Sequence, residues 1–414
     1  MKLSRIGRFS LALAVSVSLG LGMTACGGGT VAFMWVLGTQ YNQIGGFKVD
    51  NFTGNLTPVV RSPFSSNGTT PVSLVVKPGG RYLYVVNKGN GNTPGNISVF
   101  SIGGDGVITF QQSYTSRGST PVWASIDSTG TFLYVLDTLY PDTPTYPNPN
   151  GNGDITVFQI DSTTGRLQLV PNQQIKDSNQ TQLTFFPVGK TPIMMSVSNG
   201  CVFTVNSGSQ TIFPYAVGTG GQLTLTANST ITTGAGNLTS ISTSGSFVYL
   251  TDAAATPDSA GGRILPYTVT PTTCALNTLT GGPVNNLPLT SNPVFSMADN
   301  KAKTLYVLNR SSTDPNRQTS SISAFTIDPT TGKLSPLGTG GSAAAGNPYA
   351  VGSGPTCMVE DPTNQYVYTS NNIDSTLTGK RIDSNSGELR DLTRTSVFPT
   401  VGQPTCLALS GNTN

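Results

Sequence analysis

The sequence predicts an all-β fold, a seven-bladed β-propeller of four-stranded antiparallel blades. Two observations predict it. A pattern of paired strands recurs from residue 31 to the end of the chain, and the two ends of the chain carry complementary parts of one repeat. Composition agrees, because only 10% of the 414 residues are charged, while 48 glycines and 28 prolines supply many tight turns. A chain of this length can bury a large core.

The first recurring element is an apolar strand opened by Pro, a turn, and an aromatic-rich strand that ends in Asn or Asp. Residues 71–76 and 81–87 show it, with Tyr-Leu-Tyr-Val-Val-Asn at 82–87. It returns in five further segments, at residues 121–137, 192–206, 237–252, 293–309 and 355–371. Such short strands separated by Gly or Asn turns are typical of antiparallel sheets.

The second recurring element is a hairpin with a Thr-Gly or Gly-Gly turn. Residues 155–167 and 322–334 are examples, with Gly165 and Gly332 supplying the positive φ that the turn needs. Together the two elements make four antiparallel strands, which is the content of one propeller blade.

The ends of the repeat region predict the number of blades. The unit that starts at Val31 lacks its Pro-opened strand, whereas residues 404–410 form such a strand with nothing after it. We therefore expect the C-terminal strand to be the innermost strand of the first blade, which leaves seven blades. Closing the ring in this way removes exposed sheet edges.

The N-terminal segment has the features of an export signal. Three basic residues stand in the first ten positions, residues 9–21 are apolar, and Met-Thr-Ala precedes Cys26 in a way that resembles a bacterial lipobox. We expect an exported lipoprotein, anchored by its N-terminal lipid on the periplasmic or outer side. The alternative is a plain signal peptide with an incidental cysteine. The predicted organisation is a lipoprotein signal peptide (1–25), a lipidated cysteine with a glycine tether (26–30) and the propeller (31–414).

The charge of the chain gives no reason to expect a nucleic acid partner. The net charge is +3, but Lys2, Arg5 and Arg8 all lie in the signal, so the remainder carries equal numbers of basic and acidic residues. We expect a monomer that meets the membrane through its lipid and whose partner is a protein or a glycan.

Several segments resemble the propeller lactonase family, typified by 6-phosphogluconolactonase. These are the Leu-Tyr-Val-Val-Asn type of strand at 83–87, the hairpin Asp-Pro-Thr-Thr-Gly-Lys-Leu at 328–334, and Ser-Pro-Phe at 62–64. The resemblance extends over the whole mature chain and implies a hydrolase of cyclic esters.

One departure from the family concerns histidine. Family members usually carry His directly after the Pro that opens a strand, and a His is among the proposed active-site residues. This chain has no histidine, so the usual general base near neutral pH is missing. The corresponding positions hold Val72, Val122, Ile193, Leu238, Val294, Thr356 and Thr405.

Candidate site residues gather on one face of the predicted ring. The loops between second and third strands share this face with the connections between blades, and we call it the loop-rich face. Four cations on it are candidates to bind a carboxylate or phosphate, unless they are ordinary solvated charges. They are Lys88, Arg117, Lys190 and Arg310. Asp137 and Asp252 are the candidate bases near them.

Other features of the same face are less specific. The residues that close the second strands either line a polar ring or initiate turns; they are Asn87, Asp137, Asn206, Asp252, Asn309 and Asn371. The insertion at 139–151 either covers a ligand or docks a partner, or is a passive loop. The oxygen-rich residues 148–154 lack the ligand spacing of a known calcium loop. We therefore expect no metal and no cofactor.

Four cysteines follow Cys26. Cys357 and Cys406 occupy the same position in two neighbouring innermost strands, and Cys201 and Cys274 lie near one end of two other neighbouring blades. Among three connectivities we favour the disulfides 357–406 and 201–274, with free buried thiols as the alternative.

Two functions remain open on this basis. The first is a binding or scaffold propeller that engages a protein or glycan through the loop-rich face, which the missing histidine favours. The second is a divergent lactone hydrolase in which Arg117 or Arg310 holds an anion and Asp137 or Asp252 is the base.

Overall fold

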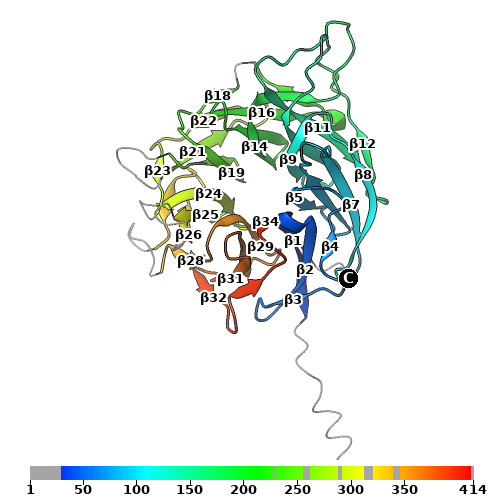
Figure 1. Ribbon diagram of the computed structural model, residues 1–414. Coiled ribbons are helices and arrows are strands. Elements are labelled where there is room, and N and C mark those ends of the chain that lie inside the picture. The colour runs from blue at the N-terminus through cyan, green and yellow to red at the C-terminus, as the bar shows by residue number, and fades with distance from the viewer. Residues whose placement is uncertain are drawn as a thin grey trace, which may run out of the picture.

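The structure, a computed structural model, describes residues 29–227, 229–254, 262–287, 291–311, 320–338 and 346–411. Within these ranges the chain forms seven antiparallel sheets arranged in a ring (Figure 1). The predicted signal peptide and Cys26 lie outside the described residues. In the part that is described, no helix is long and apolar enough to cross a bilayer.

The first three blades come from the N-terminal half of the chain and from its last strand. Blade 1 contains β34 (Pro404–Gly411), β1 (Thr30–Gly38), β2 (Gln43–Asp50), β3 (Leu56–Pro58) and β4 (Phe64–Ser65). Blade 2 contains β5 (Pro71–Val76), β6 (Tyr82–Asn87), β7 (Asn96–Ile102) and β8 (Ile108–Tyr114). Blade 3 contains β9 (Ser119–Ile126), β10 (Phe132–Leu139), β11 (Asn152–Ile160), β12 (Leu167–Leu169) and β13 (Phe186–Lys190).

The remaining four blades follow in chain order. Blade 4 contains β14 (Pro192–Ser198), β15 (Cys201–Asn206), β16 (Thr211–Val217), β17 (Leu223–Leu225) and β18 (Ile231–Thr232). Blade 5 contains β19 (Leu238–Ser244), β20 (Phe247–Asp252), β21 (Arg263–Val269), β22 (Leu276–Thr278) and β23 (Val284–Asn285). Blade 6 contains β24 (Ser291–Ala298), β25 (Thr304–Ser311), β26 (Ser320–Ile327), β27 (Leu334–Pro336) and β28 (Tyr349–Val351). Blade 7 contains β29 (Pro355–Glu360), β30 (Tyr366–Asn371), β31 (Thr376–Ile382), β32 (Leu389–Asp391) and β33 (Val397–Pro399). Two short 3-10 turns, η1 (Thr39–Tyr41) and η2 (Thr219–Gly221), complete the described elements.

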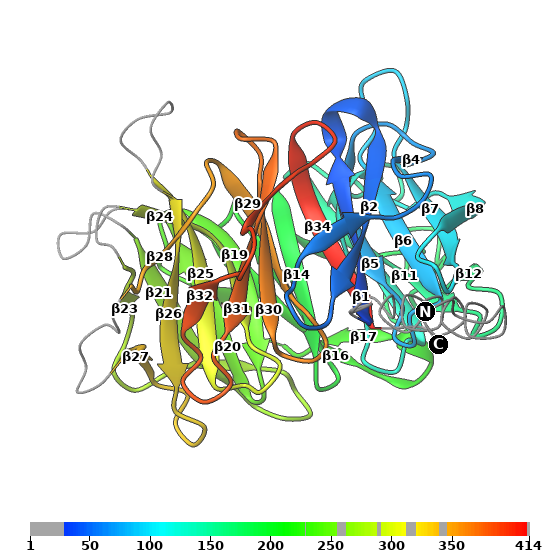
Figure 2. The ribbon, with the colours of Figure 1, turned by 90° about the horizontal axis from the view of Figure 1, so that it is seen from below.

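The ring closes as the sequence predicts. Strand β34 pairs antiparallel with β1, with Met34 opposite Leu409 and Trp35 opposite Ala408. The last strand therefore belongs to the first blade and lies beside β29 of the seventh (Figure 2). The seven-bladed propeller closed by its C-terminal strand is confirmed.

The outer edge of the blades differs from the four-stranded expectation. In six of the seven described sheets two short strands share the edge of the third strand, as β12 and β13 do on β11. The fourth strand is short; β12, for example, pairs with β11 over three residues. The connection to the next blade then pairs with the same edge of the third strand, as β13 does. These paired connections cover the edge that a longer fourth strand would occupy.

One position in blade 5 is shifted by a residue from the sequence alignment. Leu238 pairs with Asp252, just as Pro192 pairs with Asn206 in blade 4. Leu238 therefore takes the place of the opening Pro, and Thr239 is the residue after it. The equivalence given to Leu238 above is wrong, because blade 5 has no Pro to mark where the strand starts.

Tyrosines of the second strands link the two recurring elements across neighbouring blades. In four blades the tyrosine hydroxyl donates to the carbonyl of the turn glycine in the next blade's hairpin. The pairs are Tyr84 with Gly165 (2.9 Å), Tyr249 with Gly332 (2.9 Å), Tyr306 with Gly387 (2.7 Å) and Tyr368 with Gly54 (2.5 Å). Each glycine has a positive φ and lies directly against an aromatic ring or hydroxyl of the preceding blade. We call these contacts the tyrosine–glycine bonds.

Sulfur chemistry differs between the two cysteine pairs. A disulfide joins Cys201, at the start of β15 in blade 4, to Cys274, in the hairpin between β21 and β22 of blade 5. Cys357 and Cys406 are buried thiols whose sulfurs lie 3.1 Å apart. The disulfide expected between them is not formed in this structure, because this separation exceeds an S–S bond of about 2.05 Å.

Candidate functional site

The polar residues that close the second strands are buried and hold the blades together. All six are fully buried, so they form no open polar ring. Asn309 donates to Ser323 on the third strand and to the carbonyl of Leu287 in the connection from the preceding blade. Asn371 donates in the same way to Thr378. These side chains therefore bond beyond their own turns, which the turn interpretation did not include.

Asp252 is held by fixed donors. Its carboxylate forms an ion pair with Arg263 at 3.1 Å and accepts backbone N–H groups of Gly236, Asn237 and Ala254. The side chain has no exposed surface. A carboxylate in this position stabilises the connection around it and is closed to a substrate.

Asp137 lies opposite a second carboxyl, that of Asp154, which was not among the candidate residues from the sequence. It pairs across the ladder with Asp154 of β11, and both side chains are fully buried. Burial raises the pKa of Asp137 to about 8, although the hydrogen bond from Ser116 acts in the opposite direction and lowers it. Burial and the charge of Asp137 also raise the pKa of Asp154. One oxygen of each carboxyl has no hydrogen-bonding partner among the described residues.

The four candidate cations lie on separate loops. Lys88 and Lys190 are exposed. Arg117 is also exposed and lines a cavity of about 420 Å³ with Tyr114 and Phe158, between blades 2 and 3. Arg310 donates to the carbonyl of Pro355 at 3.4 Å, at the start of the neighbouring blade's inner strand. The structure does not combine these cations with Asp137 or Asp252 in one cavity that it describes.

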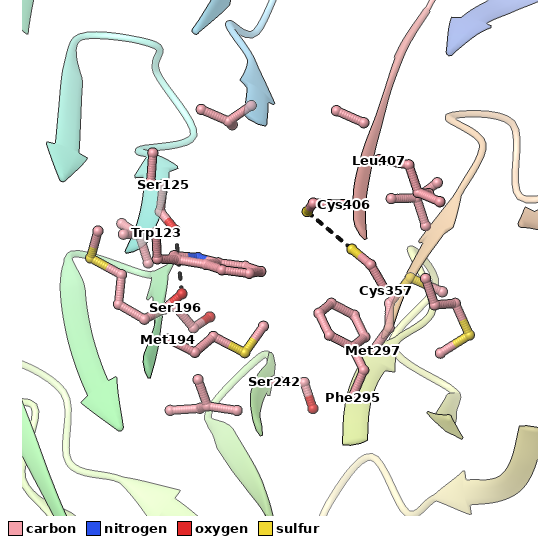
Figure 3. Close-up of a pocket in the computed structure, with 18 of the residues that line it drawn as sticks. Trp123, Ser125, Met194, Ser196, Ser242, Phe295, Met297, Cys357, Cys406 and Leu407 are labelled. Carbon is pink, nitrogen blue, oxygen red and sulfur yellow. Dashed lines mark hydrogen bonds between the residues drawn. The ribbon is translucent and has the colours of Figure 1, made fainter. Parts of the chain in front are cut away.

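A larger cavity lies inside the ring. It measures about 470 Å³ and is lined by innermost-strand residues of all seven blades. Trp123 of blade 3 and Phe295 of blade 6 approach across it, with ring centroids 6.4 Å apart (Figure 3). Met194 and Met297 add thioethers, and the hydroxyls of Ser125, Ser196 and Ser242 provide polar groups. Its lining residues include no Lys or Arg.

Glu360 is the acidic residue of this cavity. It ends β29, at the face opposite the loop-rich face, and lines the cavity with Asn300. Its carboxylate accepts the backbone N–H of Asn300 at 2.7 Å and the side-chain amide of Asn364. Burial raises its pKa to about 7, helped by the charges of Asp299 and Asp361. Glu360 therefore titrates in the range where a histidine usually does.

A comparison of the seven opening strands in the sequence could have predicted this cavity. The second residue after the opening position is Trp123, Met194, Phe295, Cys357 and Cys406 in five blades. Large apolar and sulfur-bearing residues at one repeated position mark the wall of the channel. The sequence reasoning instead placed the ligand at the loops, where propeller ligands usually bind.

The insertion at 139–151 is a folded arm. Tyr140 stacks on Phe185 of the later connection, with centroids 5.3 Å apart, and Tyr146 packs against both rings. Asn148 donates to the carbonyls of Tyr140 and Asn152. Its amide is thus used inside the loop. Within the described ranges no group of three or more metal-ligating acidic, Cys or His residues occurs.

Three exposed apolar side chains lie on loops or at a strand end of the loop-rich face. They are Tyr41 (56% exposed) in η1, Leu139 (43%) at the base of the arm, and Ile373 (47%) between β30 and β31. Tyr41 and Ile373 belong to the adjacent blades 1 and 7. Exposed apolar groups on connecting loops are a common feature of binding surfaces.

Comparison with known proteins gives one family and several similar folds. The family model "Lactonase, 7-bladed beta-propeller" matches residues 34–237. No curated protein matches the chain.

Three solved structures illustrate the likeness. A candidate 6-phosphogluconolactonase from Bacteroides fragilis is 16% identical, with 92% of this chain and 98% of that chain covered and a TM-score of 0.65. The periplasmic gluconolactonase of Pseudomonas aeruginosa is 16% identical, with 92% and 99% covered and a TM-score of 0.62. A Lactobacillus plantarum protein is 18% identical, with 92% and 100% covered and a TM-score of 0.67. At these identities the likeness concerns the fold alone.

Proposed function

The chain belongs to the lactonase family of seven-bladed β-propellers, and from this premise we propose that it is a binding member of the family. It engages a protein or glycan partner through the loop-rich face. The observation that carries the proposal is the burial of the two candidate bases. Asp137 and Asp252 have no exposed surface, and Asp252 is bound in an ion pair with Arg263. The loop-rich face therefore offers contact surface, not a hydrolytic centre.

The contact surface has a defined composition. Tyr41 and Ile373 supply exposed apolar area, and an aromatic ring can stack on a sugar as well as on a protein side chain. The arm at 139–151 is ordered by the packing of Tyr140 and Tyr146 on Phe185, so little conformational entropy is lost when it binds. The exposed cations Lys88, Arg117 and Lys190 add sites for acidic groups.

The binding proposal is tested with purified protein and matched variants. Tyr41→Ala and Ile373→Ala remove exposed apolar groups from the loop-rich face. Phe52→Ala is the control, because Phe52 is 74% exposed but lies in the hairpin between β2 and β3 on the opposite face. Capture from solubilised envelopes tests for a protein partner, and a glycan array tests for a sugar.

We expect wild type and Phe52→Ala to retain one partner that the other two variants lose. A partner that depends on Phe52 alone, or no retained partner in either experiment, contradicts the proposal.

A second candidate function is favoured by Glu360. A carboxyl with a pKa of about 7 beside a cavity of about 470 Å³ suits general base catalysis near neutral pH. In this function Glu360 takes a proton from water as the water attacks a lactone carbonyl. The ring C–O bond then breaks, and the leaving oxygen receives that proton from Glu360. The apolar lining without Lys or Arg fits an uncharged lactone better than a phosphorylated one.

The hydrolase candidate is tested by a pH profile. Hydrolysis of an apolar lactone is expected to rise through about pH 7 and to be lost in Glu360→Gln. Glu388→Gln is the control, because Glu388 is the only other glutamate and lies in a hairpin on the same face. Turnover that survives Glu360→Gln but falls in Arg117→Ala or Arg310→Ala would return the chemistry to the loop-rich face.

The proposed location is an exported, lipid-anchored position. The support is Cys26 after an apolar segment with three basic residues before it. Cys26→Ser is expected to release the protein from membranes into the soluble fraction. Equal membrane association of wild type and Cys26→Ser contradicts the anchor.

A further inference from the structure

Two thiols meet where the ring closes. Cys357 lies on β29, the inner strand of blade 7, and Cys406 lies on β34, the inner strand of blade 1. Their sulfurs are 3.1 Å apart, and both side chains line the central cavity (Figure 3). Each is the second residue after the Pro that opens its strand, so the two strands present them at the same level.

The two sulfurs lie in similar backbone surroundings. Each contacts the other, and each lies near two backbone N–H groups, those of Leu407 and Met358 for Cys357 and those of Leu74 and Leu407 for Cys406. The contact between the two sulfurs lowers the pKa of Cys406, and the same contact together with burial raises the pKa of Cys357. A pair with one stabilised thiolate and one protonated neighbour is the arrangement in which one sulfur attacks and the other resolves.

We propose that Cys357 and Cys406 are a thiol–disulfide exchange site inside the channel, which is oxidised by a small disulfide that enters the cavity. The Cys406 thiolate attacks one sulfur of that disulfide, and the other half leaves as a thiolate. Cys357 then gives up its proton, and its sulfur attacks Cys406 as the second half leaves. The pair loses two electrons and two protons, and the small disulfide becomes two thiols.

The new bond changes how the ring is held. Strand β34 is joined to blade 1 by the backbone ladder with β1 and meets blade 7 through side chains. A disulfide between residues 49 positions apart would tie it covalently to blade 7. Oxidation therefore fixes the closing strand to both of its neighbours and removes two thiols from the cavity wall.

The test follows the two thiols by mass spectrometry. Mature protein is reduced with a phosphine, freed of it, and incubated with oxidised glutathione. It is then denatured and treated with a maleimide, which marks the remaining thiols. The disulfide between Cys201 and Cys274 re-forms in the same sample and is the internal reference. Single variants Cys357→Ser and Cys406→Ser separate the two roles.

In wild type we expect the maleimide to be lost from both residues, with their peptides joined. Cys357→Ser should accumulate glutathione on Cys406, and Cys406→Ser should react at least about tenfold more slowly at Cys357. The oxidised protein should melt about 5 °C above its own reduced pair, measured with Cys201–Cys274 closed.

The proposal is overturned if both thiols still take maleimide under conditions that close Cys201–Cys274. Equal glutathionylation of the two single variants would overturn the assigned roles. The wild-type labelling needs no substitution, so it decides the question even if a variant fails to fold.

Discussion

Replacing Asp137 with Asn is expected to change how the stability of the propeller depends on pH. Asp137 and Asp154 are fully buried and face each other across β10 and β11. Asparagine suits this place, because the equivalent positions of four other blades hold Asn87, Asn206, Asn309 and Asn371. Its amide would donate to Asp154, and its oxygen would still accept from Ser116.

The size of the effect comes from the pKa of Asp137. Its pKa is raised from 3.8 to about 8. The folded protein therefore holds the proton more tightly than the unfolded chain. The stability that this proton contributes is fully present below pH 3.8 and is lost as the pH rises to about 8. Each pKa unit is worth about 1.4 kcal/mol, so the loss is on the order of 3 kcal/mol between about pH 5 and about pH 8.

The assay is guanidinium unfolding followed by the fluorescence of Trp35 and Trp123 at about pH 5 and about pH 8. Asp137→Asn should be more stable than wild type at the higher pH, and the difference should shrink at the lower pH. Asp252→Asn is the matched control in blade 5. It should lose stability at the higher pH, because it breaks the ion pair with Arg263. Parallel pH dependences for wild type and Asp137→Asn would refute the assignment of a strained carboxyl pair.

Three further predictions concern stability. Tyr368→Phe removes the tyrosine–glycine bond to Gly54 and should cost about 1–2 kcal/mol, whereas Tyr134→Phe should cost nothing, since its hydroxyl has no partner among the described residues; denaturant midpoints compare them. Gly332→Ala should lower the melting temperature far more than Gly220→Ala. Both have a φ near +70°, but only at Gly332 would a Cβ lie 2.3 Å from a ring atom of Phe247. Reducing the disulfide between Cys201 and Cys274 should lower the free energy of unfolding by about 4 kcal/mol, which denaturant midpoints with and without a phosphine would measure. The control is Cys201→Ser, whose midpoint should not change with the phosphine.

The fold was predictable because its signals repeat. Seven strand pairs with the same turn residues overdetermine a propeller, and the unpaired ends at Val31 and at residues 404–410 predict the closure. The one-residue shift at Leu238 arose in the blade that lacks an opening Pro. The doubled outer strands were missed because each of them is only two to five residues long, too short to leave a periodic pattern.

The candidate site was less predictable because it depends on which blade faces which. Asp154 stands in a strand that looks ordinary, and only the register with β10 brings it opposite Asp137. Glu360 looks like a turn residue in the sequence. Its contact with Asn364 lies within its own turn, but its contact with Asn300 comes from a turn of the neighbouring blade. Loop charges such as Arg117 were identified, but sequence position does not say whether they share a cavity.

The tyrosine–glycine bonds run in one direction around the ring, from each blade to the next, and they are missing at three of its seven seams. At the seam from blade 4 to blade 5 the tyrosine position holds Phe203, which has no hydroxyl to donate. Two residues before it, Cys201 is bonded to Cys274 in the very hairpin that such a hydroxyl would reach in the other blades. A disulfide thus takes the place of the missing hydrogen bond, and in a reducing environment this seam would have neither of the two links.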